Sequence, residues 1–218
     1  MSDTPTAPPL LHAIATRRSL RAFADLPVSD EQLAVLFEAA RWAPSGGNGQ
    51  PWRFVVTRRG DEAFDRLAAT LRPGNAAWAP HAPVLIAAAA KTVWDDPGKP
   101  VRPNRRALLD LGLALENLLL QAAHDGLMAH PMAGFDVPEA SSVLQIDDKH
   151  EAIVLLALGH PGNVATLPPE VRAKDERPRR RRPLSDFVYQ DRWGEPAGLT
   201  ELDRSAADTA GTARTDDS

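Results

Sequence analysis

The spacing of apolar residues along the chain predicts a series of amphipathic helices. In the segment VSDEQLAVLFEAARWA, apolar side chains recur at Leu33, Leu36 and Ala40, with the period of a helix that buries one face. Ser29 precedes this run, and serine is a favoured N-cap residue. The other predicted helices are LLHAIAT (ending near Thr16), DEAFDRLAATL, NRRALLDLGLALENLLLQAAHDGL and VPEASSVLQI.

Other stretches have the composition of strands. WRFVVTRR is rich in β-branched and aromatic residues, and PVLIAAAAKT and EAIVLLALGH are continuous apolar runs with the length of buried strands. MAHPMAGFD predicts a short strand and a turn. Neither G-x-G-x-x-G after a strand nor G-x-x-x-x-G-K-S/T is present, which excludes the Rossmann fingerprint and the P-loop. We therefore expect an α+β fold with helices around a sheet.

The longest predicted helix, residues 104–127, is apolar on nearly all sides. A helix without a polar face lies either inside a large core or in a subunit interface. Both alternatives are open on this pattern alone.

The two ends of the chain differ in composition from its centre. We expect residues 1–8 to be a disordered leader and residues 194–218 to be a disordered acidic tail, because neither can bury a core. Residues 9–193 would then form one domain. The N-terminus lacks a basic segment followed by an apolar run, so we do not expect a secretory signal. The longest apolar stretch, residues 82–90, is too short to span a membrane.

Charge and cysteine content exclude several functional classes. The net charge is −4 and the isoelectric point about 5.9, whereas nucleic-acid binders are usually basic. The chain has no cysteine, which excludes thiolate metal sites and a cysteine nucleophile and fits a cytoplasmic enzyme. The histidines show no metal-binding spacing, so we expect no metal. No nucleophile–base pair is apparent, so in an enzyme a cofactor would carry the chemistry.

Two short polar stretches are candidates for ligand binding. RRSLRAF places Arg17, Arg18, Ser19 and Arg21 close together. Arginine presents a planar set of donors that matches phosphate, although a solvated basic turn is the simpler interpretation. APSGGNGQPW offers polar groups at Ser45, Asn48 and Gln50, on a backbone that its glycines leave open to a planar ligand. The alternative here is an ordinary glycine turn with Trp52 in the core.

A second basic run covers residues 177–182. It is a charged surface, a nonspecific nucleic-acid contact or part of a binding site. Because Phe187, Val188 and Tyr189 follow it, we expect this segment to lie against the body of the protein or against a partner subunit. The two arginine clusters could then meet on one phosphate.

Taken together and in this order, the motifs resemble the FMN-dependent nitroreductase family. The resemblance covers about residues 9–193. The motifs that carry it are RRSxRxF, APSxxNxQPW, NAAWAPHAPVLIAAAAKT, AAHDGL, HPMAGFD, LGHP and RRRPLSDFV. It implies a nitroreductase-like fold, with a central, mostly antiparallel sheet wrapped by helices, in an intertwined homodimer. Helix 104–127 would form much of the dimer core.

The resemblance also implies roles for single residues. Arg17 and Ser19 would bind the FMN phosphate and ribityl chain, and Arg18 would help through its backbone or side chain. The basic pair Arg179 and Arg181 would close on the same phosphate.

Other residues would surround the flavin ring. Arg21 and Asn75 would lie at the pyrimidine edge. The partner subunit would contribute Pro44, Ser45 and Asn48, with Gln50 beside the site. The residues packing on the ring would be Pro131, Met132, Ala133 and Gly134, with the N–H groups of the last two facing flavin N5.

Two positions depart from the family pattern. Ala133 stands where some relatives carry a carboxylate, and Trp78 where some carry a lysine near the flavin. Arg21 would therefore bear more of the charge that stabilises the reduced flavin. Trp78 and Trp94 are candidates for the acceptor pocket, whereas we expect Trp52 to pack in the core.

The implied function is an FMN-dependent NAD(P)H oxidoreductase. NADH or NADPH would reduce the flavin at N5, and a nitroaromatic, quinone or similar planar acceptor would then take the electrons in a ping-pong cycle, without a catalytic side chain. The alternatives are an enzyme of the same fold with another acceptor, such as an enone or a semialdehyde, and a flavin-binding protein with little turnover. We expect neither nucleic acid nor membrane as a partner.

Overall fold

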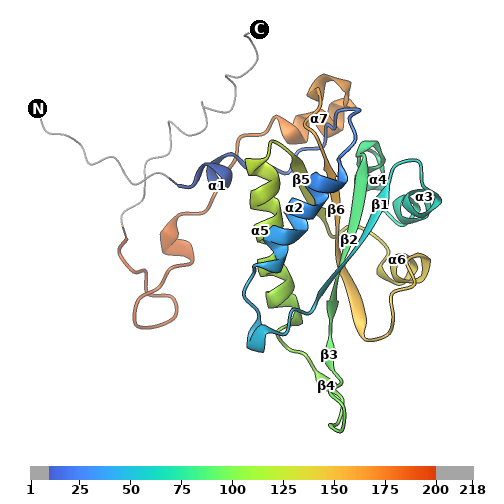
Figure 1. Cartoon of the computed structure of the whole chain (residues 1–218). Coiled ribbons are helices and arrows are strands. Elements are labelled where there is room, and N and C mark those ends of the chain that lie inside the picture. The colour runs from blue at the N-terminus through green and yellow to red at the C-terminus, as the bar shows by residue number, and fades with distance from the viewer. Residues whose placement is uncertain (1–9, 200–218) are drawn as a thin grey trace, which may run out of the picture. The chain divides into compact units, whose positions relative to one another are not determined.

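The computed structural model describes residues 10–199 (Figure 1). This part of the chain divides into two units. The larger unit is Arg17–Asp175, and the smaller one combines the residues before Arg17 with those from Glu176 onward. The predicted leader, and the predicted tail from residue 200 onward, lie outside the described residues.

The centre of the larger unit is a four-stranded antiparallel sheet in the order β1-β2-β6-β5. Its strands are β1 (Trp52–Arg58), β2 (Val84–Lys91), β5 (Met128–Met132) and β6 (His150–Gly159). The register of β2 on β6 shifts between Ala88 and Ala89. All four strands were predicted, and the antiparallel sheet is confirmed.

Strand β2 explains why an alanine-rich run forms a strand. It lies between β1 and β6, and both of its faces are buried. Ile86 and Ala88 belong to one core cluster, whereas Leu85 and Ala87 belong to the other. Strand preference depends on packing more than on intrinsic propensity, and small side chains suit a strand enclosed on both sides.

Helices cover both faces of this sheet (Figure 1). The helices α2 (Asp30–Arg41) and α5 (Ala107–His124) pack together on one face, where Leu36, Leu111 and Leu118 are buried. The other face is covered by α3 (Glu62–Ala69) and α6 (Val137–Val143). The sheet is therefore the middle layer of three, as expected for helices around a sheet.

The start of α2 is fixed by its own sequence. The Ser29 hydroxyl accepts a hydrogen bond from the Gln32 N–H at 3.2 Å, and the Gln32 side chain accepts one from the Ser29 N–H at 3.0 Å. This reciprocal pair satisfies two N–H groups that a helix start otherwise leaves unpaired. The predicted N-cap is confirmed.

Several short elements complete the larger unit. Strands β3 and β4 form a two-residue ladder at the ends of a Pro- and Gly-containing loop. The sequence did not predict this ladder or α7, because neither has enough residues to show a hydrophobic period. These elements are η1 (Gly46–Asn48), α4 (Pro73–Ala76), η2 (Ala79–His81), β3 (Val93–Trp94), β4 (Arg102–Pro103), η3 (Val164–Thr166) and α7 (Pro169–Asp175).

The smaller unit contains α1 (His12–Thr16) and η4 (Leu184–Asp186). The guanidinium of Arg179 donates a hydrogen bond to the carbonyl of Ala15, which ties the two ends of the chain together within this unit. Phe187 and Trp193 are exposed. In the part of the chain that the structure describes, no helix has both the length and the apolar character needed to cross a membrane.

Candidate functional site

The arginine-rich stretch is an extended segment held by its backbone. The Leu20 carbonyl accepts a hydrogen bond from His130 of β5 at 2.9 Å. Further on, Phe23 pairs with Pro161, and Gly162 donates to the Ala22 carbonyl at 2.8 Å. A Cβ atom at Gly162 would lie only 2.4 Å from the Phe23 backbone. The residues after β6 therefore position the end of the arginine segment.

Asp175, at the end of α7, anchors two of the arginines through its buried carboxylate and its backbone carbonyl. It accepts hydrogen bonds from the Arg21 N–H at 2.7 Å and from the Arg21 guanidinium at 2.5 Å. The Arg18 side chain donates to the Asp175 carbonyl at 2.9 Å. The Asp175 side chain is fully buried. No local pattern in the sequence singles out this residue, because it lies 154 positions from Arg21.

The pairing with Asp175 changes what Arg21 can contribute. Its charge was expected to act on the flavin, but in the structure the charge is balanced by a carboxylate in direct contact. The guanidinium also lies over the Trp78 ring, 5.7 Å from the ring centroid.

Trp78 is part of the core and not of an acceptor pocket. It is 1% exposed, and its ring lies 4.4 Å from that of His130 and 6.3 Å from that of Phe23, measured between centroids. The expectation that Trp78 shapes a substrate pocket is therefore wrong. Trp52 is buried as expected.

His130 is held neutral beneath the arginine segment. Burial lowers the pKa of His130 to about 4, and the charges of Arg21 and Arg17 act in the same direction. At neutral pH the ring is therefore uncharged. Because the Leu20 carbonyl can only accept a hydrogen bond, Nδ1 of His130 carries the proton in this contact.

Arg17 and Ser19 form the accessible part of the segment. The Arg17 guanidinium donates to the Ser19 hydroxyl at 3.1 Å, and both residues are partly exposed. Arg18 is exposed. Arg17 and Ser19 therefore place a guanidinium and a hydroxyl side by side at an accessible position, and their role in binding an anion stays a prediction.

Asn75 and Gly134 are brought together from distant parts of the sequence. The Asn75 amide donates to the Gly134 carbonyl at 3.0 Å, and a Cβ atom at position 134 would lie 2.8 Å from the Asn75 amide nitrogen. Position 134 therefore requires glycine for this close approach. Pro131 and Ala133 are accessible, whereas the Met132 side chain is buried in the core, so it does not face an open site.

The second polar stretch is a strained loop. Backbone φ angles are positive at Gly47 (61°), Asn48 (54°) and Gln50 (43°), a region that costs energy for residues with a side chain. The Ser45 hydroxyl accepts from the Gln50 N–H at 3.1 Å, and the Gln50 amide donates to the Asn48 side chain at 3.0 Å. The loop thus groups the predicted residues Ser45, Asn48 and Gln50, beside an exposed Pro44.

A second buried carboxylate, Asp110 of α5, holds this loop. Both of its oxygens accept from the Gly46 N–H, at 3.2 and 3.3 Å, and the residue is 2% exposed. The sequence analysis missed Asp110, which lies between leucines in the first turn of a mostly apolar helix. A carboxylate within such an apolar run is the signal that could have identified it.

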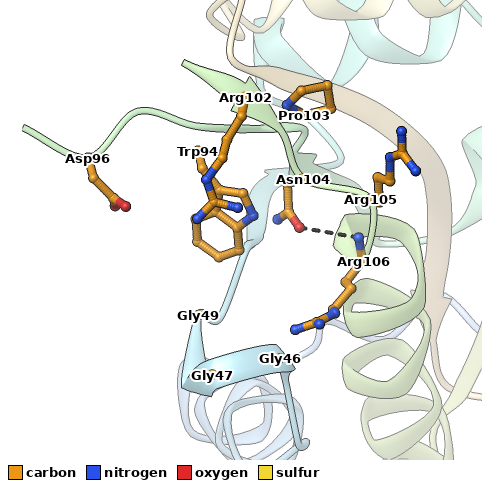
Figure 2. A pocket seen from close by; sticks show the side chains of 10 residues that line it. All are labelled: Gly46, Gly47, Gly49, Trp94, Asp96, Arg102, Pro103, Asn104, Arg105 and Arg106. Carbon is orange, nitrogen blue, oxygen red and sulfur yellow. Dashed lines mark hydrogen bonds between the residues drawn. The ribbon is translucent and has the colours of Figure 1, made fainter. Parts of the chain in front are cut away.

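An open pocket of about 610 Å³ lies between this loop and the segment that leads into α5 (Figure 2). Trp94 lies against Gly49, and Arg106 lies against Gly46. Trp94 lines this pocket, and its expected role in binding an acceptor stays a prediction. The lining residues are Gly46, Gly47, Gly49, Trp94, Asp96, Arg102, Pro103, Asn104, Arg105 and Arg106.

The two candidate stretches lie at opposite ends of α2 (Figure 1). This helix has 12 residues, which corresponds to a length of about 18 Å. Arg179 and Arg181 lie in the smaller unit, so their approach to the phosphate stays a prediction. Among the residues that the structure describes, no three His, Asp or Glu side chains are arranged to hold a metal ion.

Comparisons with known proteins identify the family of the chain. A sequence model of the nitroreductase family matches residues 14–160, more than half of the chain. An uncharacterised 15.4 kDa protein of Mycolicibacterium smegmatis is 39% identical over 153 residues, or 66% of this chain and 99% of that protein. A Streptomyces coelicolor protein named as an NADH dehydrogenase/NAD(P)H nitroreductase is 32% identical over 160 residues, or 66% of this chain and 79% of that protein.

A solved structure gives the same result at the level of the fold. A crystal structure described as an oxidoreductase containing FMN superposes with a TM-score of 0.82 at 29% identity, over 89% of this chain and 100% of that one. The chain therefore belongs to the nitroreductase family and has the fold of an FMN-containing NAD(P)H oxidoreductase.

Proposed function

We propose that the protein is an FMN-dependent NAD(P)H oxidoreductase that reduces nitroaromatics, quinones or similar planar acceptors. Family membership and the similarity to an oxidoreductase containing FMN support the reaction class. The observation that carries the proposal is the pair of polar stretches, one rich in anion donors and one lined by amides, held in place by two buried carboxylates.

The residues present fit the cofactor. Arg17 and Ser19 converge through a side-chain hydrogen bond and remain accessible, and guanidinium donors suit a phosphate. Glycine at position 134 lets Asn75 reach the backbone beside Ala133, which leaves a surface without bulky side chains for a flat ring. The accessible donors thus suit both ends of FMN.

The separation of the two stretches favours a site shared between protomers. Because the two stretches lie at opposite ends of α2, two copies would supply one stretch each to the same cofactor. Helix α5 offers a surface for this assembly. Leu109, Leu108 and Leu113 on α5 are 63%, 59% and 38% exposed, and burying such side chains against a second copy is favourable. We propose a homodimer around α5.

The proposed binding roles follow from these positions. Arg17, Arg18 and Ser19 would hold the phosphate and ribityl chain, joined by Arg179 and Arg181. Arg21 would act near the pyrimidine edge with its charge reduced by Asp175. The ring would be lined by Asn75, Pro131, Ala133 and Gly134 and, from the second protomer, by Pro44, Ser45, Asn48 and Gln50, with Met132 contributing through its backbone.

The protein's part in the chemistry would be placement and exclusion of water. FMN, when bound, would supply hydride transfer from NAD(P)H and onward reduction of the acceptor. His130 is neutral and bonded to the Leu20 carbonyl, so it would support the arginine segment and not exchange protons with substrate. Donor and acceptor would use the same slot in turn, which gives ping-pong kinetics.

The direct test is the visible spectrum of the purified protein, followed by NADH and NADPH oxidation with a nitroaromatic and a quinone. We expect flavin absorbance, or uptake of added FMN, and acceptor-dependent oxidation of the donor. Protein that takes up no FMN would contradict the proposal. If NADH and NADPH reduce the bound flavin only slowly, the result would favour a flavin-binding protein with little turnover. If activity is confined to an enone or a semialdehyde, the protein would be an enzyme of the same fold with a different class of acceptor.

The dimer has its own test. Leu109→Glu places a charge in the exposed apolar face of α5, and we expect monomers in sedimentation velocity and loss of bound FMN. Leu26→Glu changes a leucine of similar exposure, 54%, that lies outside α5, and it should leave the dimer intact. A wild-type monomer that binds FMN would refute the shared site.

A further inference from the structure

We propose that the pocket beside the Gly46–Gly49 loop binds the 2′-phosphate of NADPH and makes the enzyme prefer NADPH to NADH. The inference rests on the proposed function, because it concerns the donor of that reaction. It assigns to Arg102 and Arg106 a role in choosing the donor, separate from the residues that would hold FMN.

The charge of the pocket favours an anion. Its lining contains Arg102, Arg105 and Arg106. Asp96 is the one carboxylate among the described lining residues, and Lys99 lies 3.3 Å from it. Within residues 10–199, no carboxylate forms an ion pair with any of the three arginines. The residues that line the pocket therefore carry a net positive charge.

Two of the arginines are positioned by packing and not by ion pairs. Arg102 lies over Trp94, with its guanidinium carbon 5.6 Å from the ring centroid, and Arg106 reaches toward Gly46 (Figure 2). A Cβ atom at position 46 would lie 2.7 Å from the Arg106 side chain, and one at position 49 would lie 2.6 Å from the Trp94 ring. Glycine at both positions lets the arginine and the indole approach the loop backbone closely.

Asn104 fixes the turn that carries the arginines. Its amide donates to the Lys91 carbonyl at 3.0 Å, and its side-chain oxygen accepts from the Arg106 N–H at 3.2 Å. Asn104 is 6% exposed. In the described part of the chain, the guanidinium groups of Arg102 and Arg106 donate to no protein acceptor, so their N–H groups are available for a ligand.

Size and position select the ligand. A volume of about 610 Å³ lies in the range of small-molecule pockets and suits one nucleotide half of a donor. The same loop carries Ser45 and Asn48, which we propose line the flavin. A donor with its nicotinamide on the flavin would therefore extend its adenosine half toward this pocket. NADPH differs from NADH by one phosphate on that half, and arginine binds phosphate with two parallel hydrogen bonds.

The test compares kcat/KM for NADPH and NADH in the wild type, Arg102→Ala and Arg106→Ala, each loaded with FMN. We expect wild type to prefer NADPH. Each variant should lose roughly tenfold or more in the NADPH-to-NADH ratio, which is the effect of one charged hydrogen bond. The flavin spectrum of each variant reports whether the cofactor site is intact.

Arg105→Ala is the matched control. It removes the same charge from the adjacent residue, whose side chain points away from those of Arg102 and Arg106 (Figure 2). We expect its ratio to change less than twofold. If the NADPH-to-NADH ratio falls equally in Arg105→Ala and Arg102→Ala, the proposal is overturned, because the effect would then reflect the overall charge of the region and not a specific phosphate site.

Two nucleotide probes separate the 2′-phosphate from the pyrophosphate that both donors share. By calorimetry, 2′,5′-ADP should bind wild type more tightly than 5′-ADP, and Arg102→Ala should abolish the difference. Equal binding of the two nucleotides, or equal loss of both donors in the variants, would overturn the 2′-phosphate assignment. If the variants bind FMN and oxidise both donors with the same NADPH-to-NADH ratio of kcat/KM as the wild type, this inference alone is refuted. If the wild type shows no flavin chemistry, the proposed function is refuted.

Discussion

The arginine segment Arg17–Arg21 and the loop Ser45–Gln50 are proposed to bind one ligand, yet the fold holds them in different ways. The segment is extended and is fixed by a buried ion pair with Asp175 and by backbone pairing with residues after β6. The loop has three residues with positive φ and is tied to α5 through Asp110.

The difference has a physical reason. Phosphate donors carry charge, and several like charges in a short segment repel one another. A buried carboxylate such as Asp175 offsets that repulsion and fixes Arg21 while Arg17 stays accessible. A slot for a flat ring needs little charge but requires the backbone to turn sharply, so the loop uses strained φ angles and glycine. Substitutions that affect charge in one region and conformation in the other test this distinction.

The largest effect is expected for Asp175→Ala. It leaves Arg21 without its buried partner, so the free energy of unfolding should fall by about 4 kcal/mol. Urea denaturation measures the change. The control Glu62→Ala breaks the exposed pair with Arg66 and should cost less than about 1 kcal/mol. If both variants cost the same, Asp175 does not anchor the segment.

Lowering the pH should weaken the same region through His130. The folded protein keeps this ring neutral down to a pKa of about 4, whereas the ring in the unfolded chain takes up a proton near pH 6.5. Between these values the unfolded state binds more protons, so stability falls as the pH is lowered, by about 3 kcal/mol in total. His130→Asn should remove this part of the pH dependence in urea titrations from pH 7.5 to 4. An unchanged slope would show that His130 titrates normally.

In the loop region, Asp110→Ala should lower the free energy of unfolding by about 2 kcal/mol, because the Gly46 N–H loses its buried acceptor. Asp110→Asn keeps an acceptor oxygen and should recover at least half of that loss. Urea denaturation of both variants checks the order. An alanine variant as stable as the wild type would mean that strain in the loop does not depend on this contact.

The smallest effect is expected for Gly47→Ala. A Cβ atom there meets nothing within 4 Å, but φ is 61°. The strained backbone conformation alone should therefore lower the free energy of unfolding by about 1 kcal/mol. Gly74→Ala is the matched control, because it also meets nothing and lies in α4. It should be neutral or slightly stabilising. Thermal unfolding resolves the pair, and equal shifts would exclude a conformational origin.

Much of the fold follows from the sequence pattern. The period of Leu33, Leu36 and Ala40 predicted α2, and Ser29 predicted its start. The apolar runs predicted β2 and β6. The short ladder of β3 and β4 and the helix α7 were not predicted, because a few residues provide too little periodicity. The order of the strands was also outside the reach of local patterns.

The candidate site was predicted less completely. Arg17 contacts Ser19, and Asn75 contacts Gly134, so the fold groups predicted residues in pairs, although the pairing of Asn75 with Gly134 was not predicted and the binding roles of all four stay predictions. Asp175 and Asp110 were missed, since each is a single polar residue in a segment with no motif of its own. His130 opens the motif HPMAGFD, but its hydrogen bond to the Leu20 carbonyl joins positions far apart in the sequence and was not predicted. Trp78 was placed in a pocket and lies in the core.

By itself, the sequence determined where the longer helices and strands form and which segments carry donors, because these properties depend on neighbouring residues. The tertiary structure decided which charges are compensated. Arg21 meets a carboxylate 154 positions away, and Gly46 meets one 64 positions away, whereas Arg102 and Arg106 meet none among the described residues. The strength of a charge interaction depends on distance and burial, and only the folded chain sets these.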